Sequence, residues 1–174
     1  MSWYVLAQDI ASLVEQEARD ELWGEAAELS AAEESTVELI DRLRGAIGIE
    51  VQLSCANYEY AGQLMACGKD WVALARQGSL RLVPIAAVSW VRLPRTTASS
   101  RPKFPRSLRA VLRALVAQNV VVDTTAGQVR GIIDRVGADY LVIASNLGDA
   151  DCIVNLGQIC AVASVGSLSA WDAI

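Results

Sequence analysis

The spacing of apolar residues predicts a long helix at the start of the chain, followed by two units that each contain one short helix and several strands. Between residues 5 and 34, apolar side chains recur every three or four positions, with glutamate, glutamine and arginine between them. This is the period of an amphipathic helix. A narrow stripe suits packing on the rest of the chain and pairing with a helix of a second chain equally well, and both interpretations stay open. The stripe includes Leu6, Ile10, Leu13, Leu22 and Leu29.

The first of the two units spans residues 35–93. Ser35 and Glu38 have the spacing of a capping box, in which each side chain bonds a free backbone N–H at the start of a helix. This short helix should end at Gly48. The residues after it are rich in valine, leucine and aromatic side chains, and Gly and Asn mark turns between strands. The expected strands are 49–53, 58–67, 70–76, 80–83 and 85–93.

The second unit repeats the first at a distance of 69 residues. A duplication of this kind indicates two copies of one structural unit. The second copy should therefore hold a helix that begins after Pro105 and strands at 120–123, 128–136, 139–145, 153–155 and 159–162. The matching positions are Gly62 and Gly131, Leu64 and Ile133, Gly68 and Gly137, Asp70 and Asp139, and Trp71 and Tyr140.

These patterns divide the chain into five segments. Residues 94–104 contain prolines, serines and threonines and are expected to form an extended linker between the two copies. The predicted order is an acidic amphipathic helix at 1–34, a first repeat at 35–93, the basic linker at 94–104, a second repeat at 105–165 and a tail at 166–174.

The net charge of −5 conceals an uneven distribution. Residues 1–50 carry twelve acidic and three basic side chains, whereas residues 92–113 carry seven basic side chains and no acidic ones. The two segments could neutralise each other, within one chain or between chains. A basic run could also contact phosphates, although this one lacks the interleaved aromatic residues of a single-strand groove. Its members are Arg92, Arg95, Arg101, Lys103, Arg106, Arg109 and Arg113.

The remaining composition argues against catalysis and against a membrane location. The chain has no histidine, and its four cysteines include no C-x-x-C pair. Neither a nucleophile with a nearby base, a phosphate-binding loop nor a metal-ligand cluster is evident, so we predict no catalytic residue, no metal, no cofactor and no small-molecule substrate. The apolar runs are too short for a membrane helix, and the first ten residues lack Lys and Arg, so a cytoplasmic location is expected.

Asp70 and Asp139 are the most conspicuous polar residues of the repeat. Each follows a tight turn and precedes an aromatic residue, so we expect the carboxylate to close that turn by an Asx hydrogen bond. Trp71 and Tyr140 could stack on a nucleic-acid base, but aromatic residues at such positions more often fill a core or cover its end.

A helix followed by five short bent strands, with Gly62 or Gly131 in the second, resembles the Sm-like (LSm and Hfq) small barrel. The tandem arrangement behind an acidic helix is similar to a group of uncharacterised actinobacterial proteins, some of them labelled Fis-family regulators. The resemblance implies two five-stranded Sm-like barrels, each with an N-terminal helix. It also implies that the edges of strands four and five can pair with another barrel, so the two copies could pair with each other.

The chain departs from the Sm pattern at the positions that bind RNA. The aspartate and asparagine of the first Sm motif are replaced by Gly68 and Val72, and in the second copy by Gly137 and Leu141. The Arg-Gly or Lys-Gly of the second motif is also missing. We therefore expect a non-catalytic interaction or assembly protein that acts by self-association, as a homo-oligomer of open size, or through protein partners. The alternative is an RNA- or DNA-binding regulator that uses residues 92–113.

Overall fold

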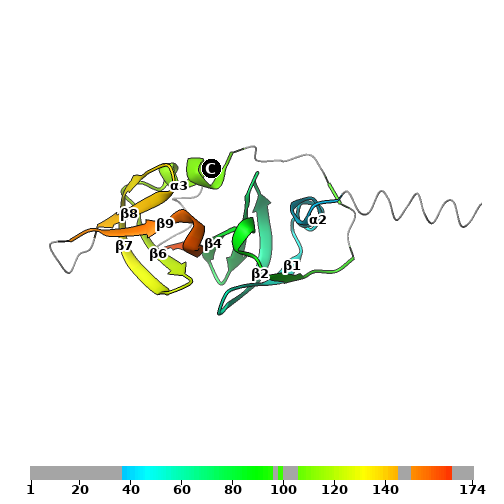
Figure 1. Ribbon diagram of the computed structural model, residues 1–174. Helices are drawn as coiled ribbons and strands as arrows, with labels where there is room; N and C mark the ends of the chain where they lie inside the picture. Colours follow the sequence, from blue (N-terminus) through cyan, green and yellow to red (C-terminus); the bar gives the residue numbers. More distant parts are fainter. Residues whose placement is uncertain (1–36, 96–97, 100–105, 145–149, 166–174) are drawn as a thin grey trace, which may run out of the picture. The chain divides into compact units, whose positions relative to one another are not determined.

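The computed structural model describes residues 37–95, 98–99, 106–144 and 150–165 (Figure 1). These residues are mainly β, with two α-helices of seven residues each. The chain divides into two compact units, Met1–Glu38 and Leu39–Ile174, and the second unit contains both repeats. The long helix predicted for residues 1–34, with its apolar stripe, lies outside the described residues. In the described ranges, no helix combines the length and the apolar character needed to cross a membrane.

The first repeat begins with a helix and continues as a meander of strands. Its elements are α2 (Leu39–Gly45), β1 (Glu50–Cys55), β2 (Tyr58–Cys67), β3 (Trp71–Arg76), β4 (Ser79–Pro84), the 3-10 turn η1 (Ile85–Ala87) and β5 (Trp90–Arg92). The predicted turn at Gln77 and Gly78 is confirmed, because both residues have positive φ, as a two-residue hairpin turn of this kind requires. The strand expected at 85–93 is instead split into η1 and the three-residue β5.

The second repeat has the same elements in the same order. They are α3 (Leu108–Ala114), β6 (Asn119–Thr124), β7 (Gly127–Val136), β8 (Tyr140–Ala144), β9 (Cys152–Asn155), the 3-10 turn η2 (Leu156–Gln158) and β10 (Ile159–Ser164). The backbone repeats closely as well. The N–H of Gly68 donates to the carbonyl of Trp71, and the N–H of Gly137 donates to the carbonyl of Tyr140, each at 2.8 Å.

The ten strands of the described residues form one open antiparallel sheet, so the prediction of two closed five-stranded barrels of the Sm-like type was wrong. The strand order is β5-β1-β2-β3-β4-β10-β6-β7-β8-β9. Closing a barrel within one repeat would require β4 to pair with β5. The edge of β4 instead pairs with β10 of the other repeat, at Leu82 opposite Val162 and Arg81 opposite Ala163 (Figure 1). Each repeat therefore remains open, and β5 and β9 form the two ends of the sheet.

Two pairs of glycines allow the strands and turns to approach closely. A Cβ atom on Gly62 would lie 2.5 Å from the carbonyl oxygen of Ala75, and one on Gly131 would lie 2.4 Å from that of Ala144. Any side chain there would push β3 away from β2, or β8 away from β7. Gly68 makes similar room for the ring of Trp71, and Gly137 for the ring of Tyr140. The glycines shared by the two copies are thus explained by close contacts.

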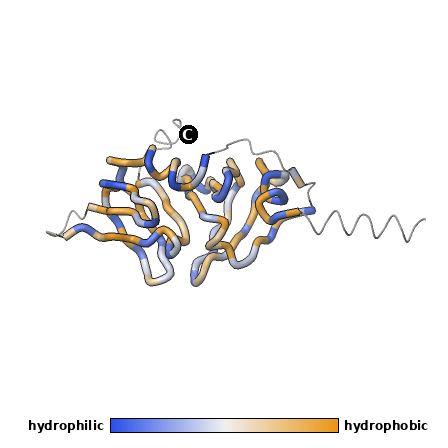
Figure 2. The backbone as a smooth tube through the Cα atoms, turned by 45° about the horizontal axis from the view of Figure 1, so that its top comes forward, coloured by the Kyte–Doolittle hydropathy of each residue, from blue (hydrophilic) through white to orange (hydrophobic). Residues whose placement is uncertain are grey.

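Among the described residues, the hydrophobic core consists of two clusters, and each takes residues from both repeats. Figure 2 colours the backbone by hydropathy and shows hydrophobic residues along the strands of both repeats. Trp71, Ala73 and Leu82 of the first repeat are buried in the cluster of the second. Cys160 and Ala161 of β10 are buried in the cluster of the first. An irregularity in the pairing of β10 between Ile159 and Ala161 interrupts the alternation of its side chains, which allows this strand to serve both clusters.

Candidate functional site: the two ends of the sheet

The contact between the two repeats is the reference with which we compare the outer ends of the sheet, because equivalent strands lie at both places. On one face of β3 and β4, Trp71 is 1 % exposed and Leu82 is 1 % exposed. Ala73 lies opposite Leu82 and is buried too. These three side chains are covered by the second repeat, because they belong to its cluster. We call this face of β3 and β4 the covered junction.

Polar contacts fix the start of α3 against the covered junction. A carboxylate oxygen of Asp70 accepts a hydrogen bond from the N–H of Leu108 at 2.7 Å. The indole N–H of Trp71 donates to the carbonyl oxygen of Arg106 at 2.9 Å. The prediction that Asp70 closes its turn by an Asx hydrogen bond was therefore wrong, because its carboxylate accepts a hydrogen bond from the first residue of α3 in the other repeat. Trp71 fills the core, as we expected.

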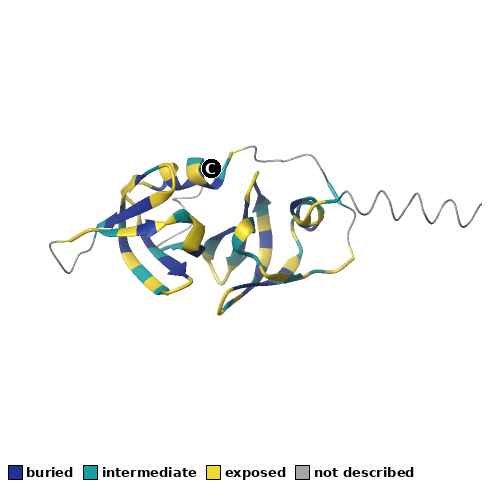
Figure 3. Cartoon of the chain, in the orientation of Figure 1, coloured by how far each residue is buried: buried dark blue, intermediate teal, exposed yellow. Residues whose placement is uncertain are grey.

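The same face of the second repeat is covered less completely by the described residues. Tyr140 and Ile153 stand where Trp71 and Leu82 stand in the first repeat, and they are 36 % and 68 % exposed. Val142, the counterpart of Ala73, is buried. Asp139 is exposed, and its carboxylate accepts no hydrogen bond of the Asp70 kind in the described part of the chain. We call this face of β8 and β9 the open junction (Figure 3).

The open junction is hollowed. A depression of about 430 Å³ is lined by Arg135, Asp139, Tyr140, Val142, Ile153 and Asn155. Its lining is more polar than the covered junction, because Arg135 replaces Ala66 and Asn155 replaces Pro84. Any partner on this face must therefore meet an exposed isoleucine and tyrosine together with an arginine and an aspartate.

The opposite end of the sheet carries the counterparts of the elements that cover the first repeat's face. In the covered junction, β10 and α3 of the second repeat supply the cover. Their counterparts in the first repeat are β5, an end strand of the sheet, and α2, whose Asp41 carbonyl oxygen accepts a hydrogen bond from the N–H of Ser99 at 2.9 Å. Leu39 is 39 % exposed, whereas its counterpart Leu108 is 7 % exposed. Trp90 of β5 is also exposed, and the guanidinium carbon of Arg92 lies 5.2 Å from the centroid of its ring.

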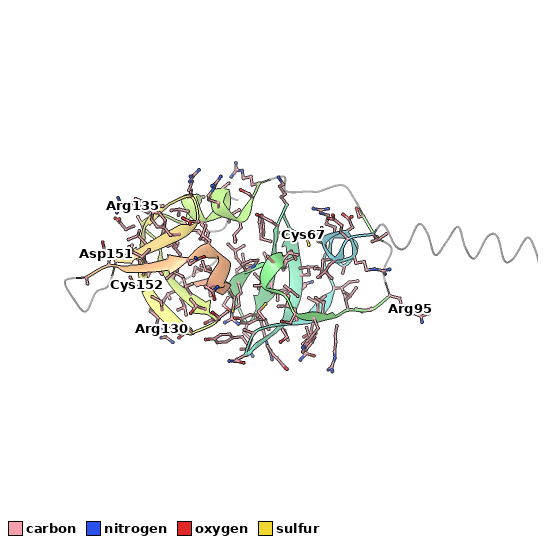
Figure 4. The ribbon with its side chains drawn as sticks, in the orientation of Figure 1. Cys67, Arg95, Arg130, Arg135, Asp151 and Cys152 are labelled. Carbon is pink, nitrogen blue, oxygen red and sulfur yellow. The ribbon has the colours of Figure 1, made fainter. Side chains whose placement is uncertain are left out.

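The structure separates the basic residues that are adjacent in sequence. Arg92 and Arg95 belong to the β5 end of the sheet, where Figure 4 labels Arg95. Arg106, Arg109 and Arg113 precede or lie on α3, and all three are exposed. The two groups thus lie on elements of different repeats, β5 of the first and α3 of the second. Arg101 and Lys103 lie outside the described residues.

A buried polar cluster links the repeats on the other side of the sheet, and sequence reasoning missed it. The hydroxyl of Tyr60 donates to a carboxylate oxygen of Asp123 at 2.9 Å, and the amide of Gln128 donates to the other oxygen at 2.7 Å. Burial, helped by Asp123, raises the pKa of Tyr60. The counterparts of Tyr60 and Asp123 in the other copy are Val129 and Ser54. The difference between the two copies at these positions was the one signal in the sequence that could have indicated this cluster.

The cysteines differ in their exposure. Cys55, Cys67 and Cys160 are buried, and Cys152 on the edge strand β9 is partly exposed (Figure 4). Burial raises the pKa of Cys55 and of Cys67 to about 12, so both thiols are protonated at neutral pH. In the described ranges, no three Cys, Asp or Glu side chains come close enough to hold a metal ion.

Comparison with known proteins bears on the second repeat alone. Residues 108–163, from the first residue of α3 to the last but one of β10, match a family described as a domain of unknown function (DUF2642). No curated protein matches the chain. The matched segment contains the open junction but neither α2 nor β5, which form the other end of the sheet.

Proposed function

We propose that this protein is a non-catalytic assembly module whose copies join head to tail through the open junction. In the proposed contact, β9 of one chain pairs with β5 of the next, as β4 pairs with β10 inside each chain. One observation carries the proposal: a face that is buried in the first repeat has an exposed counterpart in the second, at Tyr140 and Ile153.

The internal contact also predicts the register of the external one. Inside the chain, Leu82 lies opposite Val162 and Arg81 lies opposite Ala163. The first repeat places Val91 opposite Leu53 and Arg92 opposite Gln52, in the way that the second places Val162 opposite Val122 and Ala163 opposite Val121. Transferring these positions sets Val91 of the next chain opposite Ile153, and Arg92 opposite Cys152. The carboxylate of Asp139 would then face the N–H of Leu39 in the next chain.

Physical chemistry favours this contact over leaving the ends of the sheet free. An uncovered edge strand exposes backbone donors and acceptors that readily pair with another strand. Because the β5 and β9 ends differ, the contact is heterologous, and repeated contacts give a closed ring or an open filament. Arg135 and Asn155 make it more polar than the covered junction. We therefore expect a reversible association that dissociates on dilution.

Light scattering coupled to size exclusion tests the proposal. The mass of one chain is 18.6 kDa, and the proposal predicts multiples of this mass whose population rises with protein concentration. Ile153→Lys places a charge on the edge of β9 and should return the protein to a monomer. Met65→Lys adds the same charge to an exposed position of β2 and is the matched control, for which the assembly should persist.

Two results of the same experiment would overturn the proposal. A wild-type protein that stays monomeric at all concentrations would refute self-association. Assembly that survives Ile153→Lys would place the contact elsewhere, for instance on the predicted helix at 1–34. Absorbance at 260 and 280 nm, recorded together with the mass, tests the alternative. Nucleic acid that remains bound at moderate salt and leaves at high salt would favour a regulator that uses the arginines of 92–113.

A further inference from the structure

A polar cavity on the β3–β4 hairpin contains arginines that the assembly does not use. Its volume is about 270 Å³, and Glu59, Tyr60, Leu74, Arg76, Ser79 and Arg81 lie in its wall. In the ladder of β3 and β4, Leu74 lies opposite Arg81 and Arg76 lies opposite Ser79. Arg76 and Arg81 are therefore on one face of the hairpin, in adjacent strands, and both reach the same cavity.

Arg81 is held firmly in this wall. Its guanidinium carbon lies 4.7 Å from the centroid of the Tyr60 ring, which is a cation–π distance. Tyr60 is itself fixed by its hydrogen bond to the buried carboxylate of Asp123. The guanidinium is thus positioned by a chain of contacts that runs from β4 through β2 to β6, without an ion pair among the described residues.

Arg81 also has an unused donor. Its Nε–H is buried and finds no acceptor in the part of the chain that the structure describes. A buried donor without a partner is costly, and each such case in a native structure calls for an explanation. Arg76, likewise, forms no side-chain ion pair within the described ranges. Two guanidinium groups beside one cavity are suited to an oxyanion, which they can bind by charge-assisted and bidentate hydrogen bonds.

We propose that this cavity binds a small oxyanion, either phosphate itself or the phosphate group of a small monoester, through Arg76 and Arg81. The hydroxyl of Ser79 lies on the same face, where it donates to the carbonyl oxygen of Arg76 at 3.0 Å, so the two guanidinium groups supply the donors for the ligand. Glu59 in the wall repels an anion and limits its affinity. The second repeat has Ser145 and Cys152 where the first has Arg76 and Arg81, so each chain offers one such site.

Thermal unfolding in inorganic phosphate, compared with chloride at the same ionic strength, tests this site, and calorimetric titration gives the affinity. We expect a saturable rise in melting temperature for the wild type. Arg76→Gln should weaken phosphate binding by about tenfold, because one charge-assisted hydrogen-bonding group is lost. Glu59→Gln should strengthen it, since the repulsion is removed. Arg113→Gln removes an exposed arginine from α3 and should change nothing.

Arg81→Gln should abolish phosphate binding, but it also removes the contact with Tyr60 and can lower stability. Arg76 and Glu59 are exposed, so their variants keep the test valid if the Arg81 variant unfolds. A short alkyl phosphate separates the two ligands: tighter binding than phosphate indicates a monoester, and equal or weaker binding indicates phosphate. Absence of saturable phosphate binding, or binding unaffected by both Arg76→Gln and Glu59→Gln, would overturn the proposal. Neither result depends on assembly, because all wall residues belong to one chain.

Discussion

Leu82 and Ile153 occupy equivalent positions of the two repeats, and replacing Leu82 by alanine should weaken folding, whereas replacing Ile153 should weaken association. Leu82 is almost fully buried in the covered junction, whereas Ile153 is 68 % exposed in the open junction. The two substitutions remove similar side chains from similar strands. Comparing the two variants therefore shows how much of the loss in stability comes from the burial of the side chain, rather than from the type of residue that is removed.

The expected magnitudes follow from these exposures. Removing a fully buried leucine side chain costs about 2–5 kcal/mol of unfolding free energy, through lost burial and a residual cavity. Full burial of an isoleucine side chain contributes about 1.5–3 kcal/mol, so one that is already two-thirds exposed should cost less than about 1 kcal/mol in the monomer. Ile153→Ala should instead weaken association, because that side chain becomes buried only in the assembly.

Urea denaturation at several protein concentrations measures both effects. At the lowest concentration, where monomers dominate, Leu82→Ala should shift the midpoint strongly and Ile153→Ala only slightly. At high concentration the wild type gains stability from association, and Ile153→Ala should lose that gain. If Ile153→Ala costs as much as Leu82→Ala even at the lowest concentration, Ile153 is covered within its own chain and the reasoning fails.

Three further predictions test the folded chain itself. Maleimide at pH 7 should label Cys152 in the native protein and all four cysteines only after unfolding; rapid native labelling of Cys55 would contradict the burial of that thiol. Because the pKa values of Cys55 and Cys67 are raised to about 12, the unfolded chain releases these protons at lower pH than the folded one. Their contribution to stability is complete below about pH 9 and is lost as the pH rises toward 12, which urea titrations across that range should show. Gly62→Ala should destabilise the protein by more than about 1 kcal/mol in the same assay, whereas Ala66→Gly, elsewhere in β2, should cost about 1 kcal/mol or less.

The local elements of the fold could be predicted from the sequence, because their signals are local. The strand at 58–67 has the predicted bounds, and the turn at Gln77–Gly78 follows from residues that tolerate positive φ. The fifth strand was less accessible. Its apolar residues continue through Ile85–Ala87, where the backbone forms a 3-10 turn after Pro84.

The partner of each edge strand could not be predicted, because that choice depends on distant residues. The chemistry of β4 permits pairing with β5 or with β10, and the sequence pattern of the two strands is similar. The role of Asp70 escaped prediction for the same reason, since Leu108 is 38 positions away along the chain. Tyr60 and Asp123, 63 positions apart, could have been noticed only as polar residues that replace apolar or small ones of the other copy.

The candidate sites, too, depend on contacts between residues that the sequence alone does not bring together. The basic run at 92–113 is conspicuous in sequence, yet its described members lie on elements of different repeats, β5 and α3. Arg76 and Arg81 are inconspicuous in sequence and come together only because the β3–β4 ladder aligns them. Self-association was predicted in general terms, but the surface that we assign to it depends on comparing the exposure of two equivalent faces.

A disulfide cross-link between neighbouring chains tests the head-to-tail contact most directly. The proposed register sets Arg92 of one chain directly opposite Cys152 of another, and directly opposite residues of antiparallel strands are at a separation that a disulfide can bridge. Mild oxidation of the Arg92→Cys variant should produce a ladder of covalent oligomers that disappears on reduction. The wild type and an Arg113→Cys control should remain single chains under the same conditions. A wild type that already forms a Cys152-linked dimer would indicate pairing of β9 with β9, and an Arg92→Cys variant that stays uncross-linked would contradict the head-to-tail assembly.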